Sequence, residues 1–480
     1  PMTAPFVSEL ARRLQGHGPA LALPLTWVEQ QLAESGLSIE QLVRSGNQEQ
    51  AADQVSISNS IGSLRSLGTM DWREFVEAMS VVERTLRSDP GAAYAAMDFA
   101  SRDRYRHAVE EVAKASGLSE EAVASRAIEL ARAGEARYGG DDRTAHVGYY
   151  LVDGGLPDLE AATQARLPPA AALRRAASGS PLLLYLGAIT VITVLLTGGL
   201  LAEARSDGLP DWALAPLGML ALLATSGLAV ALMNWLTTLL MSPHPLPRMD
   251  FSAGIPPTSR ALVVIPTMLT SPRNLERLVE ALEVRFLANR DANLHYGLLT
   301  DFADAAEETL VDDAPLLHLA RERIESLNAR YADGRNDVFF LFHRPRCWNP
   351  HDRIWMGYDR NRGKLADLNA LLREGIGNGE VGGFSLVVGA TAVLAGVKYV
   401  ITLDTDTELP RDAARRLVGA MAHPLNRPVY DAALGRVRTG YGILQPRVSA
   451  SLPGSGQSRY ARLLGGEPGI DPYTRAVSDV

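Results

Sequence analysis

Two long apolar segments constrain this chain more than any other feature of its sequence. Residues 181–202 and 212–241 contain no charged side chain. An α-helix needs about 20 apolar residues to cross the hydrocarbon core of a bilayer, and both segments reach that length. A signal peptide is excluded by their position far from the N-terminus. The alternative is a pair of buried core helices, but these seldom run so far without a polar face. The sequence therefore predicts a transmembrane helical hairpin over residues 179–244.

The charges around the hairpin predict its orientation. The connecting loop at 203–211 is short and acidic on balance, whereas basic residues flank the two spans. Because basic flanks are retained on the cytoplasmic side, we expect residues 1–178 and 245–480 both to be cytoplasmic. The flanking residues are Arg166, Arg174, Arg175, His244 and Arg248, against Glu203, Arg205, Asp207 and Asp211 in the loop.

The overall composition excludes several classes of protein. Hydrophobic residues are 46% and charged residues 21% of the 480 residues, which excludes a disordered scaffold. The single cysteine, Cys347, excludes a disulfide framework and a thiolate metal cluster. A net charge of −8 argues against a nucleic-acid partner, because nucleic-acid-binding proteins present a basic face.

The N-terminal region predicts helices but no function. Apolar residues recur at helical spacing through residues 1–165, so we expect residues 1–178 to form a cytosolic all-α region. Asp71 followed by Glu74 resembles a capping box and predicts a helix start. His107 and His146 stand alone in the sequence, and we interpret them as isolated structural residues.

The C-terminal region, residues 255–480, shows a different pattern. Short β-branched apolar runs alternate with segments of helical periodicity, which predicts an α/β domain with a mostly parallel sheet covered on both sides. After the helix start at Ser271 and Pro272, one apolar helical face comprises Leu275, Leu278, Val279, Leu282 and Phe286. The expected strands lie at 261–266, 294–299, 337–342, 384–388, 398–403 and 441–445, and further helices at 304–331, 364–374 and 411–422.

Polar side chains follow several of the expected strands. The carboxyl ends of parallel strands meet at one edge of a sheet, where ligands bind. We therefore expect a functional site at this edge, although its members are scattered in the sequence. Those members are Thr267, Asp301, His343, Arg344, Arg346, Asp404 and Asp406.

The Asp404-Thr405-Asp406 triplet is the strongest chemical signal in the chain. In an extended segment its two carboxylates would face the same side and repel each other unless a cation lay between them. Hard oxygen ligands suit Mg²⁺ or Mn²⁺, which usually also binds a substrate phosphate. A solvated acidic turn is the alternative. The preceding buried run and the following helix start favour the metal site.

Together these motifs resemble a known family. The segments VVIPT, KLADLN (364–369), LDTDTELP (403–410) and GYGILQPRVS (440–449) look like those of family-2-type processive glycosyltransferases of the GT-A fold. The pattern RPRxWNPxxxxWMGYxRxRGKLxDLN at 344–369 and the two preceding spans more closely resemble the cyclic β-1,2-glucan synthases. This resemblance is clearest over residues 180–480.

The resemblance implies roles for individual residues. Thr267 and Asp301 match positions that hold the uracil and ribose of a nucleotide sugar. Lys364 and Asn369 match positions near the donor diphosphate. Asp404 matches the position nearer the nucleotide, and Asp406 the position on the metal. The family implies UDP-glucose as donor, Mg²⁺ or Mn²⁺ as cofactor, inversion at the anomeric carbon and a growing β-glucan as partner. It also implies a multi-pass protein of the bacterial inner membrane, in contact with the lipid bilayer.

Other residues of this region keep two interpretations. Trp348, Trp355 and Tyr358 are candidate acceptor contacts, with aromatic packing under a loop as the alternative for the tryptophans. We interpret Cys347 as structural. Two interpretations are open for Arg344, Arg346 and Arg353. They either neutralise the charge of a diphosphate or are surface residues exposed to solvent.

One departure from the family pattern bears on catalysis. We find no QxxRW-type motif, and none of Asp431, Glu467, Asp471 and Asp479 lies in a recognisable base motif. We therefore expect an N-terminal fragment of a longer synthase, truncated at the C-terminal end of its transferase domain, with the catalytic base beyond Val480. The alternatives are another processive β-glucan synthase, a polyprenyl-phosphate sugar transferase, or a non-catalytic membrane module that binds a nucleotide sugar.

Overall fold

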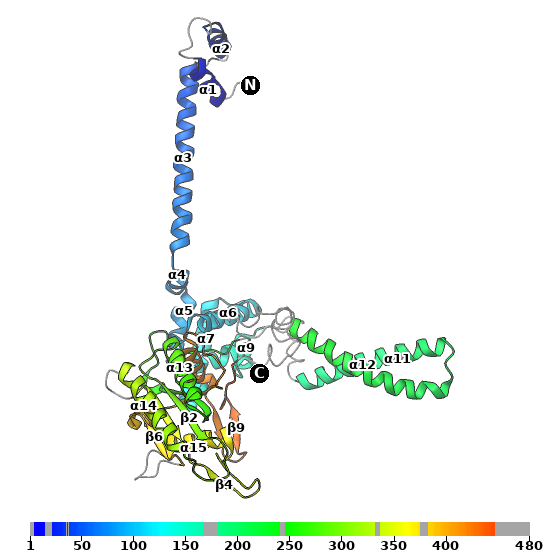
Figure 1. Cartoon of the computed structure of the whole chain (residues 1–480). Coiled ribbons are helices and arrows are strands. Elements are labelled where there is room, and N and C mark those ends of the chain that lie inside the picture. The colour runs from blue at the N-terminus through cyan, green and yellow to red at the C-terminus, as the bar shows by residue number, and fades with distance from the viewer. Residues whose placement is uncertain are drawn as a thin grey trace. The chain divides into compact units, whose positions relative to one another are not determined.

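The chain forms two compact units, Pro1–Ser80 and Val81–Val480 (Figure 1). They are seen in a computed structural model, and each is described by itself. The structure describes residues 4–14, 22–34, 36, 38–166, 180–240, 245–331, 337–374 and 383–446.

The first unit is helical. Its helices are α1 (Ala4–Leu14), α2 (Ala22–Glu34), α3 (Ile39–Thr69) and α4 (Trp72–Met79). Ser38 and Gln41 form a capping box at the start of α3. Asp71 accepts hydrogen bonds from the backbone N–H groups of Arg73 and Glu74, so the helix start expected at Asp71 is confirmed.

The second unit begins with another group of helices. They enclose an apolar core that includes Tyr94, Tyr105, Val109 and Leu151. Within the described residues this region is helical, as the periodicity predicted. The elements are α5 (Val81–Leu86), η2 (Tyr94–Ala96), α6 (Phe99–Ser116), α7 (Glu120–Tyr138), η3 (Arg143–Ala145), α8 (Gly148–Val152) and α9 (Leu156–Thr163).

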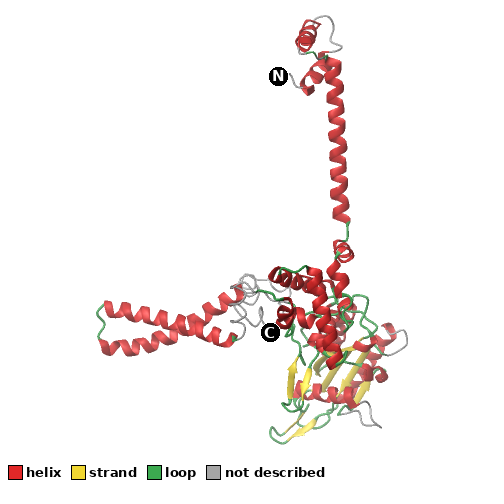
Figure 2. Ribbon diagram, turned by 180° about the vertical axis from the view of Figure 1, so that it is seen from behind, coloured by secondary structure: helices red, strands yellow, loops and turns green. Residues whose placement is uncertain are grey.

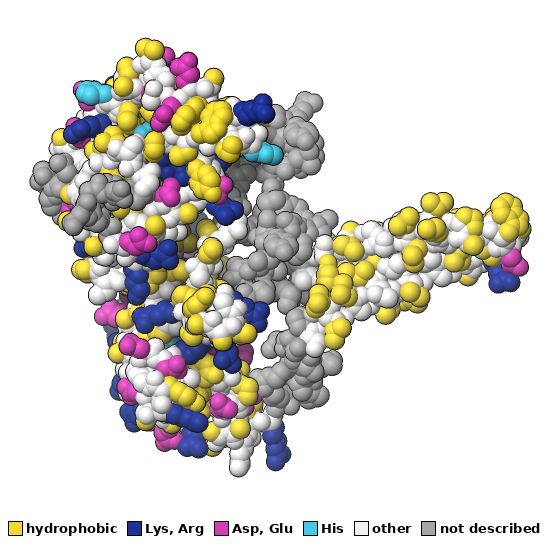
Figure 3. All heavy atoms as spheres, turned by 90° about the horizontal axis from the view of Figure 1, so that it is seen from below, with side chains coloured by type: hydrophobic (Ala, Val, Ile, Leu, Met, Phe, Trp, Pro, Cys, Tyr) yellow, Lys and Arg dark blue, Asp and Glu magenta, His cyan; other side chains and the backbone are white. Residues whose placement is uncertain are grey.

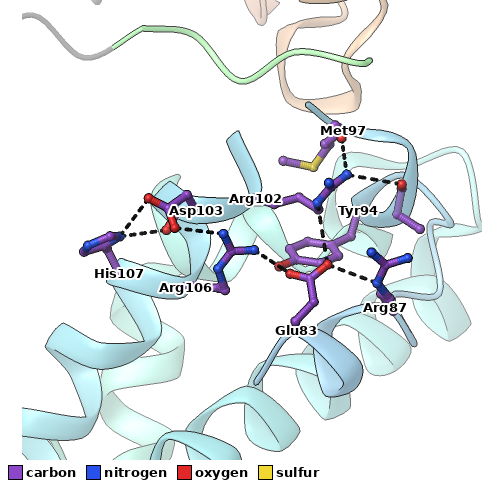
Figure 4. Close-up of polar contacts among 9 residues, drawn as sticks. Glu83, Arg87, Tyr94, Met97, Arg102, Asp103, Arg106 and His107 are labelled. Carbon is purple, nitrogen blue, oxygen red and sulfur yellow. Dashed lines mark hydrogen bonds and ion pairs between the residues drawn. The ribbon is translucent and has the colours of Figure 1, made fainter. Parts of the chain in front are cut away.

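A buried carboxylate, Glu83, joins α5 to α6 (Figure 4). It accepts hydrogen bonds from Arg106 at 2.6 Å, Arg87 at 3.0 Å and the Tyr94 hydroxyl at 2.6 Å. Because a buried charge is tolerated only when it is paired, these contacts allow the polar network to lie between helices.

His146 does not stand alone, so the interpretation of it as isolated is wrong. Its Nδ1 lies 2.7 Å from a carboxylate oxygen of buried Asp89, and its Nε2 lies 3.2 Å from the Tyr105 hydroxyl. Its ring also contacts that of His423 edge-to-face. These partners are 57, 41 and 277 positions away in the sequence, so local sequence could not reveal them. His107 is exposed, and its Nδ1 lies 2.9 Å from the Asp103 carbonyl oxygen.

The two apolar segments form a helical hairpin, α11 (Pro181–Ser206) and α12 (Asp211–Leu240). Apolar side chains cover its surface (Figure 3), and only 11% and 17% of the two candidate spans are buried. This exposure counts against the buried-core alternative. Polar contacts between the helices include Tyr185 to Asn234 at 2.6 Å and Thr197 to Thr225 at 2.7 Å. Residues 241–244, Arg174 and Arg175 lie outside the described residues.

A five-stranded sheet forms the centre of the C-terminal region, with helices on both sides (Figure 2). The strand order is β6-β3-β2-β1-β7, and β6 alone among these strands is antiparallel to its neighbour. The expected mostly parallel α/β sheet is thus confirmed. The strands are β1 (Ala261–Leu269), β2 (Leu294–Phe302), β3 (Phe339–His343), β6 (Leu386–Val388) and β7 (Tyr399–Thr402).

Alternate residues of each strand enter two apolar layers. Val263 and Ile265 face the layer that contains α13, α14 and α16, whereas Leu262 and Val264 face the layer that contains α15. Both faces of the strands are therefore buried, as expected of a parallel sheet. The helices are α13 (Pro272–Ala288), α14 (Asp313–Tyr331), α15 (Arg360–Glu374) and α16 (Ala413–Ala422), and short 3₁₀ turns occur at η4 (Pro257–Ser259), η5 (Thr391–Gly396) and η6 (Pro424–Asn426).

Three details differ from the sequence-based expectations. The helix expected over 304–331 begins only at Asp313, and residues 303–312 before it form irregular chain. The strand expected at 441–445 is wrong: these residues are irregular, and Ile443 is 89% exposed, with no neighbouring strand to pair with. Two small antiparallel hairpins were not expected, β4 (Cys347–Asn349) with β5 (Ile354–Met356), and β8 (Val429–Asp431) with β9 (Arg436–Thr439).

The helices of residues 81–166 contact the α/β region directly. Arg248 forms an ion pair with Asp98 and donates its backbone N–H to the Ser101 hydroxyl. Leu425, from the turn after α16, is buried in the helical core. The segment after the hairpin and the end of α16 therefore join these helices to the sheet.

Candidate functional site

The register of the sheet brings the expected strand-end residues to one edge. Thr267 of β1 pairs with Thr300 of β2, and Thr300 pairs with His343 of β3. On the other side of β1, the backbone N–H of Leu403 donates to the Val264 carbonyl, so Asp404 follows at the same edge. The expected convergence of these residues is present in the structure.

Asp301 is at the centre of this edge. It lies in the last part of β2 and is 1% exposed. Its Oδ1 is 2.8 Å from the ammonium nitrogen of Lys364, which projects from α15 and is also 1% exposed. Lys364 also donates a hydrogen bond to the backbone carbonyl of Thr267. The structure therefore joins Thr267, Asp301 and Lys364 in one buried cluster.

Keeping the Lys364 ammonium charged in this buried position is energetically unfavourable. Burial lowers the pKa of the Lys364 ammonium below its usual value, and the ion pair with Asp301 offsets only part of that effect. Arg344 also disfavours the charged form by repulsion. A lysine of this kind is sensitive to any change in the charge beside it.

Arg344 braces the opposite side of Asp301. Its guanidinium lies 3.3 Å from Asp301 and 2.8 Å from Asp367, and it donates to the Tyr358 carbonyl at 2.8 Å. Two glycines give it room, since a Cβ on Gly357 would lie 2.0 Å from Asp301 Oδ2 and one on Gly363 would lie 2.8 Å from the guanidinium. Arg344 is buried, so the solvated alternative is wrong for it.

The other two arginines of this region differ from each other. Arg346 is buried, forms an ion pair with Asp313 and lies over the Phe302 ring. The solvated alternative is therefore wrong for Arg346 as well. Arg353 is exposed, in a turn of the β4–β5 hairpin. Cys347 is a free, exposed thiol in β4.

Asn369 does not join the cluster. It is exposed on α15, and five helical positions separate it from Lys364, which places the two side chains about 140° apart around the helix. Lys364 shares the buried side of α15 with Leu368 and Leu371.

The Asp404-Thr405-Asp406 segment forms a turn beyond β7 instead of the extended chain that we considered. The Thr407 N–H closes the turn on the Asp404 carbonyl at 3.1 Å. Both carboxylates are exposed to solvent. In the described part of the chain no third acidic, histidine or cysteine ligand completes a protein-only metal cluster. Two carboxylates nevertheless fit Mg²⁺ or Mn²⁺, because such ions usually take their other ligands from water and a bound phosphate.

Arg285 is a residue of this edge that the sequence analysis missed. It extends from α13 beneath the Asp404–Thr407 turn and donates hydrogen bonds to that turn's backbone carbonyls. The signal was present in the sequence, because position 285 falls on the same helical face as Leu278 and Leu282. A charged residue on a buried face requires a specific partner.

The aromatic candidates flank the site on the β4–β5 hairpin and the loop after it. The Trp348 and Trp355 rings lie 5.7 Å apart, tilted by 59°, and Trp348 is 48% exposed. Backbone hydrogen bonds between Trp355 and Ala305 hold the hairpin against the chain that follows β2. Tyr358 is 66% exposed. The tryptophans form a partly exposed pair, so packing accounts for only part of their surface.

These features define a class of protein. It is an α/β protein with a mostly parallel sheet, acidic and basic side chains at the carboxyl edge of that sheet, and two apolar helices in the same chain. Helix N-termini and strand ends at such an edge are common ligand-binding positions.

The chain is 36% identical over 481 residues to the cyclic beta-(1,2)-glucan synthase NdvB of Rhizobium meliloti (strain 1021). The match covers 99% of this chain and 17% of that protein. The resemblance to cyclic β-1,2-glucan synthases is therefore confirmed, and it extends through the N-terminal helices. No protein-family profile matches the chain.

Proposed function

We propose that this chain is a donor-binding segment of a membrane-anchored glycosyltransferase that builds cyclic β-1,2-glucan from UDP-glucose. The similarity to a cyclic β-glucan synthase over 99% of the chain carries this proposal. The buried Asp301–Lys364 pair and the Asp404–Asp406 turn support it, since they place groups suited to hydroxyl and diphosphate recognition at the same carboxyl edge of the sheet, on either side of β1.

Asp301 has the chemistry for holding a nucleoside. As a carboxylate it is an acceptor, and it accepts hydrogen bonds from the hydroxyls of a ribose. Lys364 and Arg344 fix both of its oxygens in direction, so little side-chain freedom is lost when a ligand binds. We assign Thr267 to the same subsite, against the uracil, because its carbonyl already anchors Lys364.

The exposed carboxylates of Asp404 and Asp406 would hold Mg²⁺ or Mn²⁺. When bound, this ion neutralises charge on the diphosphate of the donor. Asp404 and Asp406 would orient the leaving group at the strand edge, while Lys364 keeps Asp301 in place on the nucleoside side. We keep Asn369 as a donor-binding residue on the diphosphate side; it lies on a different face of α15 from Lys364, so its contact would come from the exposed side of that helix.

For the acceptor side, we propose that the Trp348–Trp355 pair contacts the growing glucan. Sugar rings present C–H faces that pack on aromatic rings, and this pair is both ordered by Ala305 and partly exposed. Tyr358, exposed next to Gly357, is a further contact with the same chain of sugars. Inversion at the glucose carbon requires a general base, which we place outside the described residues.

We propose that α11 and α12 cross the bacterial inner membrane and keep the sheet on the cytoplasmic side. Their length and composition support this assignment. The interhelical contact between Thr197 and Thr225 is of the kind that joins helices in an apolar solvent.

Titration calorimetry of the full chain in detergent tests the donor assignment. UDP-glucose should bind in the presence of Mg²⁺, and ADP-glucose should bind more weakly. Asp301→Asn should weaken UDP-glucose by about tenfold or more, because a charged hydrogen-bond acceptor is lost. Glu280→Gln, an exposed charge on α13, serves as the matched control. Equal binding by Asp301→Asn and the unchanged chain would contradict the assignment of Asp301.

A further inference from the structure

Arg285 is a buried cation with an unusual set of partners. It is 6% exposed and lies on the sheet-facing side of α13. In the part of the chain that the structure describes, its guanidinium hydrogen bonds all go to backbone carbonyls of one turn. Its Nε donates to Thr407 O at 3.0 Å, and one terminal nitrogen donates to Thr407 O at 2.7 Å, Thr405 O at 2.9 Å and Asp404 O at 3.4 Å.

These hydrogen bonds orient the turn. The carbonyls of Asp404, Thr405 and Thr407 point toward Arg285, while the side chains of residues 404–406 are exposed. A guanidinium suits this task, because its donors form a rigid planar fork that reaches several acceptors at once. A lysine ammonium carries its donors on a single atom, so it cannot make the paired contact in which Nε and a terminal nitrogen of Arg285 both donate to Thr407 O.

Burying the charged guanidinium of Arg285 is energetically unfavourable unless nearby groups compensate for it. Burial lowers the pKa of its guanidinium, and the negative charges of Glu408 and Asp406 oppose that effect. Removing a charge from water is unfavourable, and partners must compensate for it. Here the compensation comes from the carbonyls and acidic side chains of the loop that carries the proposed metal ligands.

A second contact from the same helix holds the far end of the loop. Asn289 is the C-cap residue of α13, four positions after Arg285. Its side-chain amide donates to Leu409 O at 3.2 Å, and its oxygen accepts the Ala414 N–H at 3.1 Å. The end of α13 therefore contacts residues 404–414 at two points. Arg285 binds the turn directly after β7, and Asn289 binds the chain at the start of α16.

We propose that Arg285 is a positioning residue for the divalent cation: it holds the Asp404–Thr407 turn in the conformation in which Asp404 and Asp406 bind a metal–nucleoside diphosphate complex. This inference rests on the proposed function. It adds a role for a side chain that touches neither the metal nor the nucleotide and acts through the backbone of the turn.

The expected effect of losing Arg285 is selective. Without it the turn's carbonyls lose their donors, and because residues 404–406 are exposed, the turn can shift until water satisfies them while the sheet remains folded. The turn then samples other conformations, and ordering it must accompany metal binding. Loss of a residue that orients metal ligands typically weakens metal affinity by about 10- to 100-fold. Contacts of the nucleoside with Asp301 and Lys364 do not involve the turn.

The experiment measures Mn²⁺ and UDP binding to the full chain in detergent. Electron paramagnetic resonance of free Mn²⁺ gives the metal affinity at saturating UDP, and calorimetry with EDTA gives the affinity for UDP alone. The variants are Arg285→Lys, which keeps the charge, and Arg285→Gln, which removes it. Arg277→Lys, at an exposed position of α13, is the matched control.

We expect Mn²⁺ affinity to fall by about 10- to 100-fold in both Arg285 variants, with metal-free UDP affinity and melting temperature nearly unchanged. Unchanged Mn²⁺ affinity in Arg285→Lys would overturn the inference and leave the proposed function intact. Parallel loss of metal-free UDP binding and of melting temperature in both variants would also overturn it, since Arg285 would then only stabilise the fold. Absence of Mn²⁺-dependent UDP binding in the unchanged chain would refute the proposed function, and the inference with it.

Discussion

Lys364 and Asp301 form a buried ion pair between α15 and β2, with Nζ 2.8 Å from Oδ1 and each residue 1% exposed. The pair connects a helix to the end of a strand at the carboxyl edge of the sheet. Arg344 approaches the other oxygen of Asp301, so the carboxylate is held from two sides. These contacts hold the Asp301 carboxylate in one orientation before any ligand binds at the proposed nucleoside subsite.

Replacing Lys364 by methionine should destabilise the protein strongly. The change leaves Asp301 and Arg344 in a buried site with altered charge balance, and breaking a buried pair from one side costs about 3–5 kcal/mol. Urea unfolding followed by circular dichroism measures the loss. Lys398→Met, at an exposed lysine, is the control and should change stability by less than about 0.5 kcal/mol. Equal midpoints for the two variants would show that the pair contributes nothing to the fold.

Gly357→Ala should impair ligand binding at Asp301. A Cβ at this position would lie 2.0 Å from Asp301 Oδ2, so either the carboxylate or the loop must move. We expect UDP-glucose affinity to fall by at least about tenfold in calorimetry, because misplacing a fixed acceptor by about 1 Å is costly. Gly442→Ala is the control, since its Cβ would meet the nearest atom of Val437 at an ordinary 3.6 Å. If both alanine variants bind equally, the loop yields without disturbing Asp301.

The sequence was most informative where local rules and a simple topology rule agreed. Apolar runs predicted β1, β2 and β3, and Ser271 predicted the start of α13, where it accepts a hydrogen bond from the Asn274 N–H. The rule that parallel strands share a carboxyl edge predicted that Thr267 and Asp301 lie together. Lys364 was predicted to belong to this site only because it matches a family motif. No local pattern in the sequence indicated that it would lie beside Asp301.

Other features depend on contacts that no local pattern encodes. Arg285 reaches a turn about 120 positions later, and His146 meets His423 across 277 positions. The alternation of Tyr441 and Ile443 resembled a strand, yet a strand forms only where a neighbour offers hydrogen bonds, and these residues have none in the described sheet. Asn369 was assigned by motif alone, and its role stays a prediction, because the helical rotation places it on a different face of α15 from Lys364.

Acid should destabilise the α/β region through His343. Burial lowers the pKa of this imidazole from its usual 6.5 to about 4, so the folded protein keeps it neutral while the unfolded chain protonates. Between pH 6.5 and 4 the unfolded state binds more protons, and stability therefore falls as pH falls, by at most about 3 kcal/mol. His423, whose pKa burial also lowers, acts in the same direction.

His343→Asn isolates the contribution of this residue. Asparagine does not titrate, and its side chain can still meet the Thr300 hydroxyl, which lies 2.9 Å from His343 Nδ1. We expect urea unfolding at pH 7.5, 6 and 5 to show a shallower loss of stability in the variant than in the unchanged chain. Parallel pH profiles would mean that His343 binds the same number of protons in both states.

The proposed topology can be checked with the single native cysteine. Cys347 is exposed on the α/β region and should face the cytoplasm, so a membrane-impermeant maleimide added to intact cells should not label it. Ser206→Cys in a Cys347→Ser background should be labelled, because Ser206 ends α11 next to the acidic loop. Permeabilised cells, in which both positions should react, provide the control. Labelling of Cys347 in intact cells would show that the α/β region faces away from the cytoplasm, opposite to the proposed orientation.

Asp406→Asn should remove the metal dependence of UDP binding. Losing one charged ligand leaves a cation and a diphosphate under-coordinated, and we expect a cost of about 2 kcal/mol or more in the presence of Mg²⁺. Titration calorimetry with Mg²⁺ and with EDTA measures the difference for each protein. Glu280→Gln is the control, because it removes one negative charge from an exposed position on α13, away from the turn. A general electrostatic effect would weaken both variants alike, whereas direct ligation would weaken Asp406→Asn alone. Equal UDP affinity of the unchanged chain with Mg²⁺ and with EDTA would exclude a metal at this turn and leave the exposed carboxylates as a solvated acidic turn.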